Sequence, residues 1–324
     1  MRAMERIEAA IAGRRTDRVP WAFWRHVPGR DTDPRRLAAA TLAFQRRFGF
    51  DLVKLTPAGG YAAEAWGARL VPRRNPEGTR EYLSRVVARP EDWRRLKAPP
   101  LDTGVFGREL RALRLVRRGL ARDVPLLQTV FSPLSVARSL SADLWRAHLV
   151  HCPADLEAGL ATLARASAAF ARRCLDAGAD GIFFAVQTAT ADLVPDAAYR
   201  RFGERYDRIV LDAIRERTPL VLLHLHGFRT HFDRIRRYPV PILNWHDRRA
   251  GPSLVAGLRR FRGACCGGLD AWGVLRSGTP SEVRRDVGGV LQATNGRRII
   301  LGAGCVIPVD TPEANLDAVR GALG

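Results

Sequence analysis

The chain contains few cysteines and no long apolar run, and each shortage excludes a class of protein. Its five cysteines include no C-x-x-C pair and are too sparse for a disulfide framework, which indicates a reducing compartment. No stretch approaches the roughly eighteen uninterrupted apolar residues of a membrane span. The first residues, MRAMERIE, carry acidic groups where a signal peptide needs an apolar segment. We therefore expect a cytoplasmic protein without a membrane partner.

Arginine almost completely replaces lysine: Lys54 and Lys97 are the only lysines among the 53 basic residues. With 33 acidic residues the formal net charge is +20, a balance typical of proteins that bind nucleic acids. However, the arginines are scattered in pairs, and the sequence has no basic tail, zinc finger or RNA-binding motif. This distribution argues against a nucleic-acid partner and modestly favours an acidic small-molecule substrate. A non-enzymatic basic binding protein is the remote alternative.

Strand-like apolar runs alternate with helical patterns along the chain. They lie at 18–24, 51–55, 124–130, 181–186, 219–225, 240–245, 264–269 and 298–302. Strands that alternate with helices pair in parallel, and eight such units favour a single α/β domain of the (β/α)8 TIM-barrel type over an open doubly wound sheet. No GxGxxG or Walker loop follows a strand, which weakens the nucleotide-binding alternative. The Pro- and Arg-rich region 68–100 is expected to be an inserted hairpin with its own small sheet.

The run at 219–225 ends in two histidines and a glycine, and other functional candidates lie at equivalent ends of strands. Residues i and i+2 of a strand share a face, so His224 and His226 point the same way. In a barrel of this type the active site lies at the carboxyl ends of the strands. The candidates at those ends are Arg25, His26, Lys54, Thr56, Phe131, Ser132, Gln187, His224, His226, Asn244, Trp245, His246, Asp247, Asp270 and Cys305.

His224, His226 and Cys305 form the sharpest of these groupings. Cys305 follows the last predicted strand. Zinc favours nitrogen and thiolate donors in tetrahedral geometry, and a catalytic zinc site keeps one position open. A zinc site on these three residues is therefore one interpretation. In the other, the histidines hydrogen-bond to loop backbone and Cys305 fills a gap in the packing.

A second group comprises candidates for catalysis and substrate binding. His246 beside Asp247 can act in acid–base chemistry, with Arg25 as a further catalytic candidate; alternatively, Asp247 forms a structural ion pair with a neighbouring arginine. Arg25 and Arg30 can either grip a substrate carboxylate or form surface ion pairs. The full set of predicted substrate-binding residues is Arg25, His26, Arg30, Lys54, Gln187, Trp245 and Asp270.

Three segments resemble the uroporphyrinogen decarboxylase superfamily. Asp17–Pro20 (DRVP), before a Phe-x-Arg segment, is similar to the opening of that family. Gly267–Asp270 (GGLD) resembles its Gly-Asn-x-Asp segment, and Gly304–Pro308 (GCVIP) resembles the end of its last strand. The similarity extends over essentially the whole chain. It implies a single barrel domain over residues 1–324, in a family whose members are often dimeric.

One branch of the superfamily comprises the porphyrinogen decarboxylases, which carry two arginines in a Phe-Met-Arg-Gln-Ala-Gly-Arg motif. Here Arg25 and Arg30 stand at the ends of a similar segment that is one residue longer. Residues 55–60 contain no counterpart of the essential aspartate of that branch. Membership of this branch would imply decarboxylation of uroporphyrinogen or a related acidic substrate, without a cofactor.

The other branch comprises zinc-dependent methyltransferases that move a methyl group between a corrinoid protein and a thiol. Their His-x-Cys-Gly and Gly-x-Gly-Cys segments supply zinc ligands and resemble His224–Gly227 (HLHG) and Gly302–Cys305 (GAGC). The resemblance implies zinc on His224, His226 and Cys305, and a corrinoid protein as partner and methyl donor. His226 replaces the middle cysteine, which makes the metal centre less electron-rich. We expect zinc-assisted methyl transfer to a thiol, with decarboxylation as the alternative.

Overall fold

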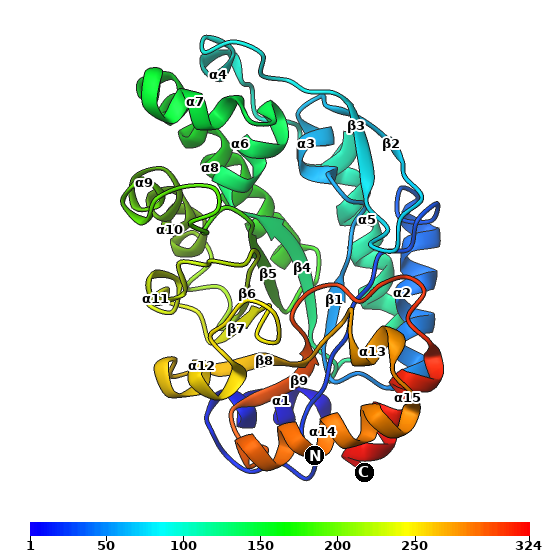
Figure 1. Cartoon of the computed structure of the whole chain (residues 1–324). Coiled ribbons are helices and arrows are strands. Elements are labelled where there is room, and N and C mark those ends of the chain that lie inside the picture. Colours follow the sequence, from blue (N-terminus) through cyan, green and yellow to red (C-terminus); the bar gives the residue numbers. More distant parts are fainter.

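The structure, a computed structural model, describes residues 1–324, and a parallel sheet of seven strands runs through its centre. The strands pair in the order β1-β4-β5-β6-β7-β8-β9, and the sheet curls, with helices on its outer side (Figure 1). This is the alternation of strand and helix that the sequence pattern predicted. The strands of this sheet are β1 (Val53–Leu55), β4 (Leu126–Phe131), β5 (Gly181–Val186), β6 (Leu220–Leu225), β7 (Ile242–Trp245), β8 (Ala264–Leu269) and β9 (Ile299–Ala303).

The helices differ widely in length. None combines the length and the apolar content that crossing a bilayer requires. They are α1 (Ala3–Ile11), α2 (Pro34–Phe48), α3 (Tyr61–Ala65), α4 (Asp92–Arg95), α5 (Gly104–Gly119), α6 (Pro133–Ser141), α7 (Leu144–His151), α8 (Pro153–Asp176), α9 (Asp196–Tyr199), the π-helix η1 (Arg200–Glu204), α10 (Arg205–Asp212), α11 (Phe232–Ile235), α12 (Leu254–Arg260), α13 (Val274–Ser277), α14 (Pro280–Thr294) and α15 (Glu313–Leu323).

Local sequence signals set the ends of α2. The Asp33 carboxylate accepts a hydrogen bond from the backbone N–H of Arg36, and Pro34 occupies the first turn, where its missing N–H costs nothing. Gly49 ends the helix in the left-handed conformation, with φ 74°. These local signals place the ends of the helix at Pro34 and Phe48.

The first strand expected from the sequence, at 18–24, is not formed. Trp21 makes only an isolated parallel bridge to Leu301 of β9, through the N–H of Ala22, which donates to the Leu301 oxygen at 3.0 Å. On the other side, the N–H of Asp51 donates to the Trp21 oxygen. Pro20 has no N–H to give, which interrupts a continuous ladder. The sheet therefore has seven strands, with an extended segment between β9 and the start of β1.

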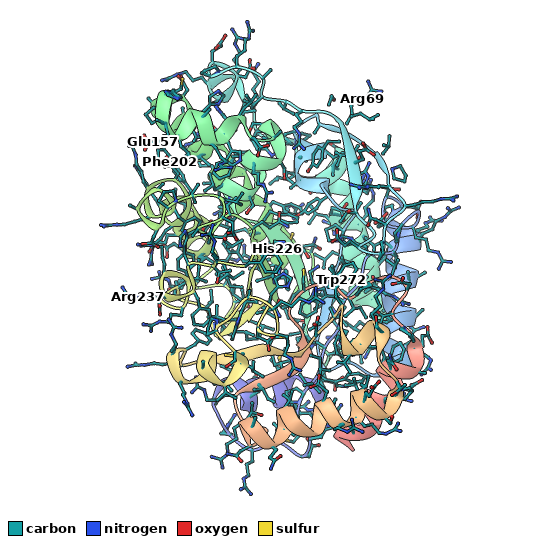
Figure 2. All side chains as sticks on the ribbon, viewed as in Figure 1. Arg69, Glu157, Phe202, His226, Arg237 and Trp272 are labelled. Atoms are coloured by element: carbon teal, nitrogen blue, oxygen red, sulfur yellow. The ribbon has the colours of Figure 1, made fainter.

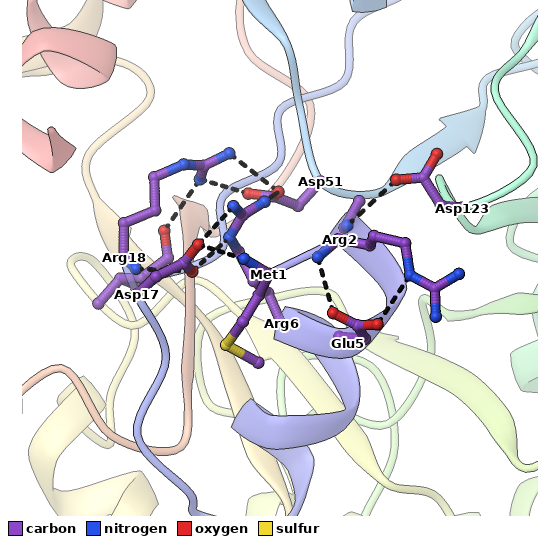
Figure 3. Close-up of polar contacts among 10 residues, drawn as sticks. Met1, Arg2, Glu5, Arg6, Asp17, Arg18, Asp51 and Asp123 are labelled. Atoms are coloured by element: carbon purple, nitrogen blue, oxygen red, sulfur yellow. Dashed lines mark hydrogen bonds and ion pairs between the residues drawn. The ribbon is translucent and has the colours of Figure 1, made fainter.

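An ion-pair network anchors that segment at the end of the molecule where both termini lie (Figures 1 and 3). Asp51 is buried, and its carboxylate accepts hydrogen bonds from the guanidinium groups of Arg6 and Arg18 and from the N–H of Trp21. Arg6 also pairs with Asp17. Because a buried carboxylate is stable only when its oxygens are paired, the Asp17–Pro20 segment has a structural role here.

The buried side chains form two clusters on opposite sides of the curled sheet. A smaller cluster fills the interior of the curl and includes Phe183, Leu222 and Cys266. A larger cluster lies between the sheet and the helices and includes Leu223 and Cys265. Adjacent residues of one strand thus serve different cores, as strand alternation requires.

The inserted region expected at 68–100 contains an antiparallel hairpin separate from the main sheet. Its strands are β2 (Arg69–Pro72) and β3 (Arg80–Ser84), drawn in cyan in Figure 1. Its strands are mostly exposed, yet Arg80 and Tyr82 reach the cavity described below. The hairpin therefore forms one wall of the candidate site.

Candidate functional site

Strand β6 directs two histidines to one face. Leu220 and Leu222 point into the interior of the curled sheet, and His224 continues that face, stacked on Phe183 with ring centroids 5.6 Å apart. His226 lies two residues further on, and its N–H still donates to the Val186 oxygen of β5. The shared face predicted for the two histidines is thus the interior face.

Four donor side chains meet at this point: His224, His226, His246 and Cys305 each offer one atom within 4.8 Å of the others. The Cys305 sulfur lies 3.6 Å from His224 Nε2 and 3.9 Å from His226 Nδ1. His246 Nε2 lies 3.2 Å from His226 Nδ1. The structure therefore brings together the three predicted metal ligands and adds a fourth donor.

Three separations among these donors lie close to those of a tetrahedral zinc site. Zinc bonds of about 2.0–2.1 Å to nitrogen and 2.3 Å to sulfur place two nitrogens about 3.3 Å apart, and nitrogen and sulfur about 3.6 Å apart. The observed separations of 3.2, 3.6 and 3.9 Å lie close to these values. Imidazole nitrogen and thiolate sulfur are also the donor types that zinc prefers. The residues present therefore fit a zinc ion.

A close backbone approach brings Cys305 to the histidines. A side-chain carbon at Gly304 would lie 2.6 Å from the Trp245 oxygen and 2.7 Å from His246 Cα, distances that side-chain carbons essentially never show. Only glycine allows the loop after β9 to pack against the end of β7 in this way. Gly304, the second glycine of the GAGC segment, is thus required to bring Cys305 into the donor cluster.

Burial keeps the histidines of the cluster neutral. It lowers the pKa of His224 well below the usual value, that of His226 to about 4, and that of His246 as well. Neutral imidazoles have free lone pairs, the form in which they bind a metal. Burial raises the pKa of the Cys305 thiol to about 11, so this residue would lose its proton on binding a metal.

A cavity of about 360 Å³ opens beside the four donors, and its lining includes part of the hairpin wall. His226 and Trp272, both labelled near the centre of the molecule in Figure 2, belong to its lining. A cavity of this size holds a small ligand. The candidates from the sequence that line it are His26, Lys54, Thr56, Phe131, Gln187, His224, His226, His246 and Cys305.

Lys54 lines this cavity and has no acidic partner, whereas Arg80, the other basic residue of the lining, pairs with Glu64. Its Nζ donates to the Thr56 hydroxyl at 3.2 Å and lies 4.6 Å from the centre of the Phe183 ring. The residue is buried, which lowers the pKa of its amine to about 7. An unpaired buried cation in a ligand-sized cavity is a favourable position for an anionic group.

Arg25 and Arg30 do not line this cavity. They line a neighbouring cavity of about 270 Å³, which α2 borders and which shares Trp24, Lys54 and Thr56 with the first. The Arg25 guanidinium stacks on Phe44 at 4.4 Å. The structure does not bring these two arginines into the cavity of the donor cluster. Spacing along the chain placed them near a strand end but could not show which cavity they line.

Trp245 and Asp270 also lie outside the cavity lining. Trp245 points to the opposite face of β7 from its neighbours, where its indole N–H donates to the Pro252 oxygen at 2.7 Å. Asp270 pairs with Arg249 at 2.9 Å. Both side chains have structural partners in this arrangement.

Asp247 is buried and does not line the cavity. Its Oδ1 accepts a hydrogen bond from the Gly268 N–H at 3.3 Å, and burial raises the pKa of the carboxyl to about 7. The ion pair with a neighbouring arginine is absent, because Arg248 pairs instead with Asp286. The sequence order alone gave no indication that Asp247 would be turned inward.

The sequence predicts an acid–base role for His246, and it predicts no role for Asn244 beyond its position at a strand end. The structure places both beside the predicted ligands, because β6 and β7 pair in parallel with His224 opposite Asn244. The same register, continued by two residues, sets His246 next to His226. A signal existed in the sequence: both strands end in polar residues at i and i+2.

Comparison with known proteins gives a family and a fold. The family model described as "Uroporphyrinogen decarboxylase (URO-D)" matches residues 2–323. A relative from Methanosarcina mazei, named methylcobamide:CoM methyltransferase MtbA, is 27% identical over 302 residues, covering 91% of this chain and 85% of the relative. A protein of the same name from Methanosarcina acetivorans is 24% identical over the same extent.

Solved structures agree on the architecture. A methyltransferase from Methanosarcina mazei superposes with a TM-score of 0.86 at 21% identity, covering 99% of this chain and 98% of the other. A B12-independent methionine synthase from Shewanella sp. W3-18-1 gives a TM-score of 0.62 at 13% identity, covering 94% and 97%. At these identities the comparison establishes the fold alone.

Proposed function

The chain belongs to the uroporphyrinogen decarboxylase family, and we propose that within this family it is a methyltransferase that moves a methyl group from a corrinoid to a thiol. The observation that carries this proposal is the cluster of His224, His226, His246 and Cys305 at one point of a small-molecule cavity. The name shared by the two Methanosarcina relatives supports the same activity.

His224, His226 and Cys305 would hold a zinc ion, with His246 as a fourth donor that a substrate can replace. Bound zinc would hold the sulfur of a substrate thiol as its thiolate, a better nucleophile than the thiol. With three imidazoles and one thiolate, the site carries less negative charge than one with two thiolates. That charge favours an anionic sulfur ligand over a neutral one.

The proposed overall reaction balances without an added oxidant or reductant. The methyl group leaves the cobalt of a methylcobamide, and its carbon forms a new bond to the thiol sulfur. The cobalt keeps the electron pair of the broken Co–C bond, and the thiol releases its proton to solvent. A corrinoid protein as partner would present the methyl group at the mouth of the cavity.

Lys54 would hold an anionic group on the thiol substrate. Both Lys54 and His224 lie against the ring of Phe183, so one small molecule can contact the amine and the donor cluster together. Replacement by methionine (Lys54→Met) should raise KM for 2-mercaptoethanesulfonate while leaving KM for neutral 2-mercaptoethanol nearly unchanged. An equal rise for both thiols would contradict this role.

We also propose that residues 1–324 form one barrel domain. The hydrogen bonds of Ala22 to β9 and of Trp21 to Asp51 support a closure of the curled sheet through the extended segment. Decarboxylation receives no comparable support, because Arg25 and Arg30 line a cavity other than that of the donor cluster.

The test uses the purified chain with zinc, methylcobalamin and 2-mercaptoethanesulfonate. We expect one zinc per chain, loss of the methylcobalamin absorption spectrum and formation of the methyl thioether. Cys305→Ala should abolish both zinc retention and turnover. Cys152→Ala, which removes another half-buried free cysteine, is the matched control and should change neither. Absence of stoichiometric zinc, or of any methyl thioether, would overturn the proposal.

A further inference from the structure

We propose that Asn244 is a positioning residue that fixes the tautomer of His224 for metal binding. The inference rests on the proposed zinc site and goes beyond it, since Asn244 is not itself a donor. Asn244 is fully buried on β7, directly opposite His224 of β6. Its side chain contacts three neighbouring strands, and each contact has a defined donor and acceptor.

Two backbone carbonyls determine which way the Asn244 amide points. Its Nδ2 donates to the Cys266 oxygen of β8 at 2.8 Å and to the Ala303 oxygen of β9 at 2.9 Å. Carbonyl oxygens can only accept, so the NH2 group must face them. The opposite orientation would place three acceptors together in a buried position without any donor.

With the NH2 group fixed, the amide oxygen must face His224. Asn244 Oδ1 lies 2.6 Å from His224 Nδ1, and an amide oxygen can only accept a hydrogen bond. The proton of the neutral imidazole therefore resides on Nδ1. His224 Nε2 then carries the free lone pair, and this is the nitrogen that lies 3.6 Å from the Cys305 sulfur.

The hydrogen bond between Asn244 and His224 selects the tautomer in the metal-free protein. In water the two tautomers of an imidazole interconvert, and a site that accepts either one must reorder its ligand on binding. Here His224 is buried, and Asn244 is its one hydrogen-bond partner through Nδ1. Partners of this kind orient metal-binding histidines, and their loss typically weakens metal affinity about 10- to 100-fold.

Two substitutions separate positioning from mere packing. Asn244→Leu and Asn244→Asp both remove the two bonds to the Cys266 and Ala303 oxygens, so both should lower the free energy of unfolding. Only the aspartate keeps an oxygen that accepts the His224 proton. We therefore expect zinc affinity, measured by chelator competition, to fall about 10- to 100-fold in Asn244→Leu and to stay near that of the unaltered chain in Asn244→Asp.

Asn315 provides a matched control. It is equally buried, and its Nδ2 also donates to two backbone oxygens, those of Leu275 at 2.9 Å and Gly278 at 2.8 Å. Asn315→Leu should therefore lower stability as Asn244→Leu does, yet leave zinc affinity unchanged. The absorption bands of the cobalt-substituted protein, which report ligand geometry, should change in Asn244→Leu alone.

A measurement on the unaltered apoprotein guards against variants that do not fold. Nitrogen-15 spectra of the histidine-labelled chain distinguish the two imidazole tautomers, and His224 should carry its proton on Nδ1. The opposite tautomer, equal zinc affinity in Asn244→Leu, or equal losses in the leucine and aspartate variants would each overturn the inference. Failure of the unaltered chain to bind zinc would overturn the proposed function instead.

Discussion

At the scale of single residues, the donor cluster is defined by what stands at position 226. The methyltransferases that this chain resembles have cysteine there, whereas His226 supplies a neutral imidazole nitrogen. The adjacent His246 Nε2 lies 3.2 Å away, so the cluster has three imidazoles and one thiol. Because a thiolate donates more charge to zinc than an imidazole does, this exchange should decide how nucleophilic a bound substrate sulfur is.

Replacing His226 by cysteine tests this idea. We expect His226→Cys to bind zinc more tightly and to transfer methyl groups faster at saturating thiol, because a second thiolate makes the centre more electron-rich. The measurement is the rate of methylcobalamin loss together with a zinc competition titration. His231→Cys is the control, since His231 bonds to the Val194 oxygen and lies outside the cavity. Slower transfer with intact zinc binding would contradict the idea.

Lys54 should make stability depend on pH. Its pKa falls from 10.5 in the unfolded chain to about 7 in the fold, so between these values the unfolded chain binds more protons. Stability therefore rises with pH across this window, and burying Lys54 costs most below pH 7. Lys54→Met should raise the free energy of unfolding by a few kcal/mol at pH 6, at about 1.4 kcal/mol per pKa unit, and by nothing above pH 10.5.

Urea unfolding at several pH values measures this effect. Lys97→Met is the matched control, because Lys97 is exposed and its replacement should leave the unfolding free energy unchanged at every pH. A constant difference between the Lys54→Met variant and the unaltered chain across the pH range would show that burial does not govern the titration of Lys54.

At the scale of elements, the register between neighbouring strands and the capping of helices determine where residues are placed. β6 and β7 end in the same register, which places their polar terminal residues side by side. Helix α14 packs against β8 and begins in a capping box, in which the Thr279 hydroxyl accepts from the Glu282 N–H and the Glu282 carboxylate accepts from the Thr279 N–H.

The capping box gives a prediction at this scale. Thr279→Ala should destabilise the protein by about 1 kcal/mol, because the N–H of Glu282 loses its acceptor. Thr103→Ala is the control: Thr103 also precedes a helix, α5, but its side chain makes no capping bond. Urea unfolding of both variants should separate them, and equal losses would show that the capping bond contributes nothing.

At the scale of the whole molecule, the formal charge of +20 coexists with extensive pairing of arginine to acidic residues on the surface. Exposed pairs of this kind contribute little stability individually. The larger contribution should come from a ligand that joins distant segments. Zinc on His224, His246 and Cys305 would connect the ends of β6, β7 and β9.

Zinc should therefore stabilise the whole chain. At free zinc about 100 times above Kd, the gain is about 2.7 kcal/mol, which raises Tm by several degrees. Calorimetry of the protein before and after treatment with a chelator measures the change. His224→Ala should unfold at the same temperature with or without zinc, and a zinc-dependent Tm in that variant would place the stabilising ion elsewhere.

The sequence by itself determined the parallel α/β architecture and the shared face of His224 and His226. Both depend on local periodicity: apolar runs alternate with helical segments, and strand residues two apart point the same way. The ends of α2 also depend on local signals, because Asp33 and Gly49 each act on the adjacent turn of the helix. The sequence also named His224, His226 and Cys305 as a group, through their position at strand ends and a family resemblance.

Only the tertiary structure decided which of these residues meet. The register of β6 against β7 placed His246 and Asn244 beside the predicted metal ligands, and the packing of Gly304 against His246 brought in Cys305. The position of α2 placed Arg25 in a neighbouring cavity. Strand register, helix placement and loop packing depend on contacts between residues far apart in the chain, and no local pattern encodes them.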